Sequence, residues 1–247
     1  MCRQMEDQMI DLYTWPTPNG HKIHIMVEEC GLEYNIIPIN IHEGDQFDPE
    51  FLEISPNNKM PAIVDHDGPG GKPIPVFETG AILIYLADKT GRFLPHRDND
   101  PNAYYDVIQW LMFQMGGVGP MFGQAGHFRN YALERFPPEA VQYGIDRYTN
   151  EAKRLYNVMD RRLDGREWIA GNDYSIADIA IFPWCRTPER RGVDHNDYPN
   201  CSRWFDRVAA RPAVQRGVKV LEEHRRAGPH SDKSWEMMFG ARQYARR

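Results

Sequence analysis

The stretch that decides the fold of this 247-residue chain is SPNNKMPAIVD, residues 55–65. Pro61 stands at the mouth of a short apolar strand. A proline there cannot donate a ladder hydrogen bond, so it suits a sheet edge or a tight cis turn. The main chain of Met60 is then left to pair with an extended peptide, as in strand addition. The stretch therefore predicts an open backbone segment beside a turn.

A second predicted strand, Ile74–Phe77, leads directly through Glu78 into an apolar helix that Thr79 opens. Backbone N–H groups at a helix start have no helical partners, and together with the helix dipole they favour a carboxylate. The carboxylate of Glu78 complements this by holding an ammonium group. Together with the open segment at Met60, the pattern predicts a socket for a short anionic peptide. The alternative is an ordinary hairpin followed by a capped helix that binds nothing.

Outward from this stretch, residues 9–93 alternate predicted strands and helices. The helix expected over 21–30 carries apolar residues on one face, and Gly31 suits its C-terminal cap. A short helix is expected to start at Asp48, with a proline in its first turn. The order strand, helix, strand, helix, strand, strand, helix predicts a small α/β domain with a mixed four-stranded sheet. The strands are expected at 9–13, 34–41, 62–64 and 74–77.

Residues 91–101 are polar and bounded by proline, as is typical of a linker. Beyond them the pattern is helical, which predicts an all-helical domain over 100–225 with one long amphipathic helix at 139–163. The glycine-rich stretch 115–121 is expected to kink or break a helix. Residues 226–247 are expected to form an irregular C-terminal tail, yet their aromatic side chains indicate that the tail packs on something.

Composition excludes several classes of protein. A formal charge of −6, with no basic stripe, argues against a nucleic-acid-binding protein. The longest apolar run, 81–87, is too short to span a membrane, and the N-terminus lacks the apolar segment of a secretory signal. The four cysteines, Cys2, Cys30, Cys185 and Cys201, form no C-x-x-C motif and no zinc-like cluster. We expect a cytoplasmic protein with free thiols, no metal, and a dispensable extension at residues 1–8.

Several motifs fall in the order found in one family. An α/β domain with this strand–proline and Glu-Thr-Gly pattern, followed by an all-helical domain, resembles the glutathione transferase superfamily. The segment YSIAD at 174–178 is similar to the capping box in the helical domain of that superfamily. More narrowly, TPNG at 17–20, residues 55–65 and GVGPMFGQ at 117–124 resemble the nu class. The resemblance covers about residues 9–221.

The resemblance implies a thioredoxin-like N-terminal domain, an all-helical C-terminal domain and a homodimer. It also implies that glutathione binds with its cysteinyl backbone paired to Met60, beside a cis bond before Pro61. The γ-glutamyl end would then meet Glu78 and Thr79.

The same resemblance assigns three further residues. The glycyl end of glutathione would meet Gln46 and Lys59, although by sequence alone Gln46 is only a loop residue. Arg147 could be a solvated helix residue, but the resemblance implies that it reaches a glutathione carboxylate, in its own subunit or in the partner. One or two glutathione molecules per site are expected.

Thr17 and Asn19 lie in the break between the first strand and the first helix. A hydroxyl, an amide and helix N–H groups there can donate to a sulfur anion. Lowering the pKa of a thiol from about 8.5 by roughly 2 units requires about 2.7 kcal/mol of preferential thiolate stabilisation, which such donors can supply. The alternative is that Asn19 only caps the helix. Tyr13 lies near the position at which many transferase classes carry a catalytic tyrosine. The nu-class pattern instead places the sulfur contacts on Thr17 and Asn19.

The function expected is that of a glutathione-dependent disulfide oxidoreductase that uses glutathione thiols and not protein cysteines. Its partner substrate would be a small-molecule disulfide, held beside residues 110–128. Two alternatives stay open: conjugation of glutathione to small electrophiles, and a non-catalytic regulatory protein that binds glutathione. The C-terminal tail is expected to fold over the acceptor pocket or onto the other subunit.

Overall fold

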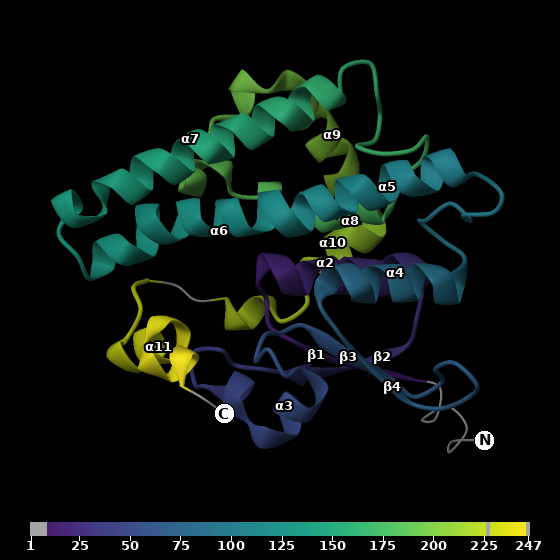
Figure 1. Cartoon of the computed structure of the whole chain (residues 1–247), viewed down its shortest axis with the longest axis horizontal. Coiled ribbons are helices and arrows are strands. Elements are labelled where there is room, and N and C mark those ends of the chain that lie inside the picture. The colour runs from purple at the N-terminus through teal and green to yellow at the C-terminus, as the bar shows by residue number, and fades with distance from the viewer. Residues whose placement is uncertain (1–8, 226–227, 246–247) are drawn as a thin grey trace. The chain divides into compact units, whose positions relative to one another are not determined.

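The computed structural model describes residues 9–225 and 228–245 (Figure 1). The chain forms two compact units, one made of Met1–Leu83 with Arg216–Arg247 and the other of Ile84–Gln215. The extension expected at residues 1–8, with its Cys2, lies outside the described residues. None of the helices in the described part of the chain combines the length and apolar character that a membrane-spanning segment needs.

The first unit contains one four-stranded sheet in the order β2-β1-β3-β4. Its strands are β1 (Ile10–Thr14), β2 (Tyr34–Pro38), β3 (Ala62–Asp65) and β4 (Ile74–Phe77). β1 pairs parallel with β2, and β3 pairs antiparallel with both β1 and β4. Leu12 lies opposite Ile36 on one side and Ile63 on the other. The mixed four-stranded sheet predicted from the element order is therefore confirmed.

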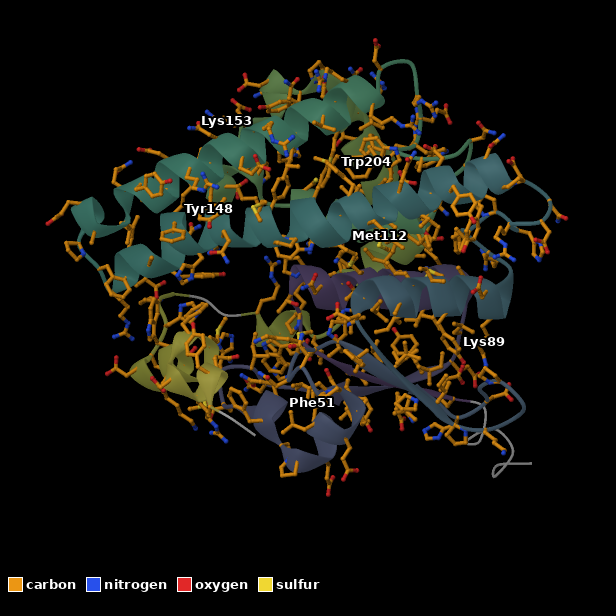
Figure 2. The ribbon with its side chains drawn as sticks, viewed as in Figure 1. Phe51, Lys89, Met112, Tyr148, Lys153 and Trp204 are labelled. Carbon is orange, nitrogen blue, oxygen red and sulfur yellow. The ribbon has the colours of Figure 1, made fainter. Side chains whose placement is uncertain are left out.

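Helices cover both faces of this sheet, with α2 (Pro18–Cys30) on one face and α3 (Pro49–Ile54) on the other (Figure 1). α2 starts at an N-cap, because Oγ1 of Thr17 accepts a hydrogen bond from the Gly20 N–H at 3.2 Å. It ends at Gly31, whose φ of 67° is the left-handed conformation that glycine adopts without steric cost. Phe51 of α3, labelled in Figure 2, is buried against Ile39 and Ala62.

The second unit is helical. The helix α4 (Thr79–Thr90) leads into it from the first unit, and α5 (Pro101–Phe113), α6 (Gly119–Gly126), α7 (Pro138–Arg162), α8 (Ile176–Ile181), α9 (Pro199–Ala209) and α10 (Pro212–Gly217) follow. The glycine-rich stretch does not break the helix. α5 continues into α6 through a π-helical turn at Gln114–Val118. Hydrogen bonds in a π-helical turn span five residues and not four, so the turn holds one more residue than an α-helical turn and the helix stays continuous. A thioredoxin-like α/β unit followed by helices confirms the predicted fold class.

A buried carboxylate holds the centre of the second unit together. Asp178 is fully buried and accepts hydrogen bonds from the main-chain N–H groups of Ser175 (3.0 Å) and Ile169 (2.9 Å). The indole Nε1 of Trp204, labelled in Figure 2, donates to the same side chain at 2.8 Å. With Oγ of Ser175 accepting from the Ala177 N–H, this confirms the capping box predicted for residues 175–178.

The tail differs from the irregular segment that the sequence pattern suggested. Its described residues form α11 (Asp232–Phe239) and a 3-10 helix, Ala241–Tyr244. Ser231 caps α11 by accepting from the Ser234 N–H, and Trp235 and Phe239, one turn apart, pack with ring centroids 4.9 Å from each other. The N-cap and the aromatic pair favour a helix here, and the contacts of the segment with the rest of the first unit add to its stability.

The Asp178→Asn variant is expected to lose about 2–4 kcal/mol of unfolding free energy, because an amide presents N–H groups to donors that now face carboxylate oxygens. Urea unfolding of the variant beside Asp173→Asn, an exposed residue of the segment that precedes α8, measures this. Equal stability of the two variants would contradict a structural role for the buried carboxylate.

Candidate active site

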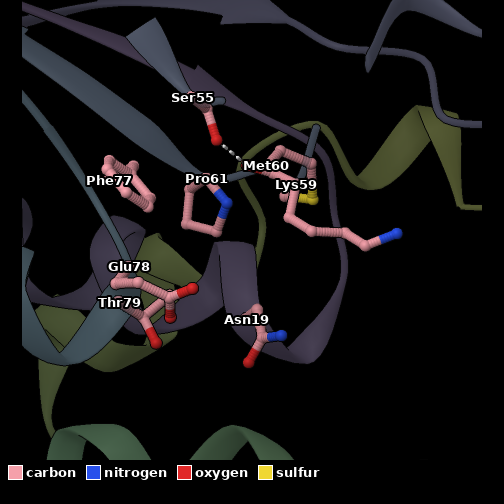
Figure 3. Close-up of a pocket in the computed structure, with 8 residues that line it drawn as sticks. All are labelled: Asn19, Ser55, Lys59, Met60, Pro61, Phe77, Glu78 and Thr79. Carbon is pink, nitrogen blue, oxygen red and sulfur yellow. Dashed lines mark hydrogen bonds between the residues drawn. The ribbon is translucent and has the colours of Figure 1, made fainter. Parts of the chain in front are cut away.

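The loop before β3 is closed on itself by a buried serine. Oγ of Ser55 donates to the carbonyl oxygen of Lys59 at 2.8 Å, the dashed line of Figure 3. Asn58 adopts a left-handed φ of 48°, and the peptide bond between Met60 and Pro61 is cis, as the resemblance implied. No described residue hydrogen-bonds the Met60 main chain, which precedes β3. Among the described residues the loop thus leaves the Met60 main chain without a backbone hydrogen-bond partner, and that this segment pairs with a peptide stays a prediction.

The junction between β4 and α4 is strained. Glu78 has a φ of 69°, a left-handed conformation that costs a non-glycine residue about 1–2 kcal/mol. Such strain persists only where the surrounding structure imposes it, and it is concentrated at functional sites. It places the exposed Glu78 carboxylate beside Thr79, the first residue of α4. A carboxylate and a helix start therefore lie side by side, as the two ends of an amino acid require.

A buried lysine stands behind Thr79. The ammonium Nζ of Lys22, a residue that is only 2 % exposed, donates to Oγ1 of Thr79 at 3.1 Å. Burial lowers the pKa of Lys22 to about 7, and the negative charge of Glu78 opposes part of that shift. An ammonium group can only donate, so the hydroxyl of Thr79 is the acceptor in this hydrogen bond. The buried lysine thereby fixes the position of the Thr79 hydroxyl at the start of α4.

The start of α2 supplies the polar groups predicted to face a sulfur atom. Asn19 is half-buried in the first turn of α2, directly after Pro18. The hydroxyl of Thr17, besides capping the helix, donates to the thioether of Met60, with Oγ1 and Sδ 3.7 Å apart. A thioether is a weak acceptor, so this proton is available to a stronger one.

These elements enclose a pocket of about 170 Å³, lined by Asn19, Ser55, Lys59, Met60, Pro61, Phe77, Glu78 and Thr79. Figure 3 shows Glu78 and Thr79 on one side of Pro61 and the Lys59 side chain extending away on the other, with Asn19 below. The pocket therefore offers a carboxylate, a hydroxyl and a helix start at one end and an ammonium group at the other. Six of the predicted site residues are brought together here.

Comparison with known proteins identifies the family. Residues 8–88 match the family model "Glutathione S-transferase, N-terminal domain", and residues 136–212 match "Glutathione S-transferase, C-terminal domain". The chain belongs to the glutathione S-transferase family. It is 50 % identical over 207 residues to the disulfide-bond oxidoreductase YfcG of Escherichia coli K12, which covers 83 % of this chain and 93 % of that relative.

Two solved structures are similar to this transferase-family chain. A glutathione transferase family member from Pseudomonas fluorescens, with two glutathione molecules bound, has a TM-score of 0.79 and 49 % identity over 86 % of this chain and 93 % of that one. A glutathione transferase from Pseudomonas putida, with one glutathione disulfide bound per subunit, has a TM-score of 0.79 and 47 % identity over 86 % and 92 %.

Three residues considered in the sequence lie elsewhere in this transferase-family chain. Gln46 is buried and donates both its amide N–H groups to main-chain oxygens, those of Ile41 (3.2 Å) and Met237 (3.3 Å). Arg147 is an exposed residue of α7, in the second unit. The ring of Tyr13 packs on Phe51 with centroids 6.0 Å apart, and burial raises its pKa.

Sequence reasoning missed Lys22, Ser55 and Phe77. Lys22 precedes Met26 by one turn, which places it on the apolar face of α2, and the helix dipole disfavours a cation near a helix start. A lysine on the apolar face near a helix start is unusual, and this feature of the sequence could have identified Lys22. Phe77 is the last residue of β4, and it lines the pocket because it directly precedes Glu78. Ser55 carried no sequence feature that separates it from an ordinary loop serine.

The cysteines of the described residues are not placed for catalysis. Cys185 and Cys201 are buried, and burial raises the pKa of Cys185 to about 11 and that of Cys201 further. Cys30 is half-buried and does not line the pocket. Within the described ranges, no three His, Cys, Asp or Glu side chains gather as a metal site would require.

Replacing Lys22 should change how stability depends on pH. The pKa of Lys22 is about 7 when folded against 10.5 ordinarily, so between these values the unfolded chain binds more protons and stability rises with pH. Lys22→Met should remove this contribution, which is at most about 1.4 kcal/mol per pH unit. Urea unfolding at pH 7, 8 and 9, with the exposed Lys219→Met as control, measures it. If the unfolding free energies of wild type and Lys22→Met changed with pH in the same way, the lowered pKa of Lys22 would be refuted.

Proposed function

We propose that this chain is a glutathione-dependent disulfide-bond oxidoreductase that works with the thiol of bound glutathione. The observation that carries the proposal is the pocket itself. It has a carboxylate, a hydroxyl and a helix start for one end of a short peptide and an ammonium group for the other, but none of its lining residues is a cysteine. The relationship to YfcG and the glutathione disulfide in the Pseudomonas putida structure support the same chemistry.

Each end of glutathione has a complementary group. The γ-glutamyl ammonium would meet the Glu78 carboxylate, and the γ-glutamyl carboxylate would meet the Thr79 hydroxyl and the first N–H groups of α4. The cysteinyl backbone would pair with the Met60 main chain beside Pro61. The glycyl carboxylate would meet the Lys59 ammonium at the other end of the pocket.

The thiol of the bound peptide would lie at the start of α2. The Asn19 amide and the Thr17 hydroxyl, which now donates only to a thioether, would donate to the sulfur. A thiolate is a far better acceptor than a thioether, so both groups favour the ionised thiol and lower its pKa. Ionisation near neutral pH is what the reaction requires of glutathione.

The reaction then proceeds in two exchanges. The bound glutathione thiolate attacks one sulfur of the substrate disulfide, forming a mixed disulfide and releasing the other sulfur as a thiolate, which takes up a proton. A second glutathione thiolate attacks the glutathione sulfur of the mixed disulfide, which forms glutathione disulfide and releases the second substrate thiol. The two electrons that reduce the substrate come from two glutathione molecules. A site with room for two glutathione molecules suits this sequence.

Three features of the proposal go beyond the pocket. We place the chain in the nu class on its motifs, as a homodimer in which Arg147 reaches a glutathione carboxylate of its own subunit or of the partner. We place it in the cytoplasm, which its free thiols Cys30, Cys185 and Cys201 suit. Gln46 remains a weaker candidate ligand, because both its N–H groups already donate to main-chain oxygens.

The Asn19→Ala variant should reduce 2-hydroxyethyl disulfide with a kcat/KM about 10- to 100-fold below wild type, the loss of one hydrogen bond to a charged sulfur. The thiolate absorbance of bound glutathione should appear at higher pH than in wild type. The control is Asn102→Ala, since Asn102 likewise follows the proline that starts a helix, α5. Unchanged turnover in Asn19→Ala would remove Asn19 from the thiolate site.

A variant with all four cysteines replaced should keep disulfide turnover within about twofold of wild type, because the reacting thiols belong to glutathione. Conservative replacement by alanine or serine suits the buried Cys185 and Cys201. Turnover of an electrophilic aryl halide, measured beside it, separates disulfide reduction from conjugation. Loss of disulfide turnover in a cysteine-free protein that still binds glutathione would overturn the mechanism.

A further inference from the structure

The C-terminal segment, residues 231–245, belongs to the first unit and packs on the rest of that unit beside the pocket. Nδ1 of His42 and Oγ of Ser234 are 2.8 Å apart, and both residues belong to this unit. The guanidinium of Arg242 lies over the Phe47 ring, 4.7 Å from its centroid. Lys233 forms an ion pair with Glu43. The segment thus covers the loop that follows β2, and α11 is its yellow helix in Figure 1.

The buried side chain of Gln46 hydrogen-bonds to this segment. Its side chain is 3 % exposed, and its two N–H groups donate to Ile41 and to the Met237 carbonyl of α11. Only the oxygen Oε1 remains, buried and without a hydrogen-bond partner among the described residues. An oxygen accepts and cannot bind a carboxylate. The Gln46 amide therefore holds the tail, which leaves Lys59 as the stronger candidate for the glycyl carboxylate of a bound peptide.

Gln243 holds that lysine. Its oxygen Oε1 accepts from Nζ of Lys59 at 2.8 Å and from Nδ2 of Asn58 at 3.3 Å. Its own Nε2 donates to the Met237 carbonyl at 2.6 Å, so the amide is anchored at both ends. A lysine side chain has many rotamers, so a hydrogen bond that orders it before a ligand binds lowers the conformational entropy lost at binding.

We propose that Gln243 is a positioning residue that presents the Lys59 ammonium to the glycyl carboxylate of glutathione, so that the C-terminal segment completes this end of the site. The inference rests on the proposed function and deepens it. The amide of Gln243 is neutral, so it orders Lys59 without cancelling its charge. An ammonium group has three N–H donors, so donation to Gln243 is compatible with donation to a ligand carboxylate. Preorganisation of this kind raises affinity because less ordering is required at binding.

The test compares two ligands by calorimetry: glutathione and γ-glutamylcysteine, which lacks the glycyl residue. Gln243→Ala should weaken glutathione binding about 3- to 10-fold and leave γ-glutamylcysteine binding within about twofold, because only the glycyl carboxylate meets Lys59. Gln243→Glu should weaken glutathione binding more, since its carboxylate would pair with Lys59 and repel the ligand. Tyr244→Ala, an 80 % exposed neighbour, is the matched control and should change neither.

Coupling to Lys59 is tested by a double-mutant cycle. In a Lys59→Met background, Gln243→Ala should change glutathione binding by less than about twofold, because its effect passes through the ammonium group. An equal loss for both ligands would make Gln243 a structural residue only, and would overturn the proposal. Tighter glutathione binding in Gln243→Ala would also overturn it, since Gln243 would then occupy the place of the carboxylate.

Failure of the proposed function has a different signature. Wild-type protein that binds neither ligand would refute the glutathione site as a whole, and with it this inference. Wild-type protein that binds glutathione and reduces 2-hydroxyethyl disulfide, with no ligand-selective loss in Gln243→Ala, would refute the role of the tail alone.

Discussion

The hydrogen bond from the Lys22 ammonium to Oγ1 of Thr79 joins the N-terminal half of α2 to the first turn of α4, and the pocket is organised around it. α2 follows β1 and α4 follows β4, so each helix start carries the polar residues of its own strand–helix junction. Asn19 comes from one junction and Glu78 from the other. Burying a lysine costs free energy, because burial disfavours its charged form. The strained backbone at Glu78 adds to that cost. Both costs fall at one site, as is expected where a protein gives up stability for function.

The chemistry of this site depends on a thiol that the chain does not itself supply. Two of its cysteines are buried, with raised pKa values that keep them protonated and unreactive. Around the pocket, by contrast, polar donors are assembled where a ligand sulfur would lie. The fold thus buries Cys185 and Cys201 and provides electrostatics, orientation and an open backbone segment for a peptide that brings the reactive group. This division explains how a thioredoxin-like unit without a C-x-x-C motif can serve thiol–disulfide exchange.

The C-terminal segment reaches the end of the pocket at which the glycyl group of glutathione is expected. Because Met237 takes an N–H of Gln46, and Gln243 takes one of Lys59, a segment outside the two matched domains reaches two residues expected at the glycyl end. The aromatic residues of the tail predicted that the tail packs on something, but they did not predict which part of the protein it packs on. The described tail lies on its own thioredoxin-like unit, against the loop after β2 and the turn at Asn58 and Lys59.

The sequence by itself determined several features that arise within a few residues: the proline turn at Pro61, the capped start of α8, the glycine end of α2 and the strand–helix junction at Thr79. These depend on local backbone preferences and capping hydrogen bonds, which neighbouring residue types specify directly. It also determined the sheet, because the order of the elements leaves few right-handed solutions. The start of α2 was predicted less well, since the helix begins at Pro18 and not at residue 21, and its N-cap is Thr17 and not Asn19. Only the tertiary structure decided that Lys22 stands behind Thr79, that Gln46 faces the tail and that Gln243 reaches Lys59, 184 residues away along the chain. Contacts of that kind depend on how the elements pack and not on the residues beside them, so no local pattern specifies them.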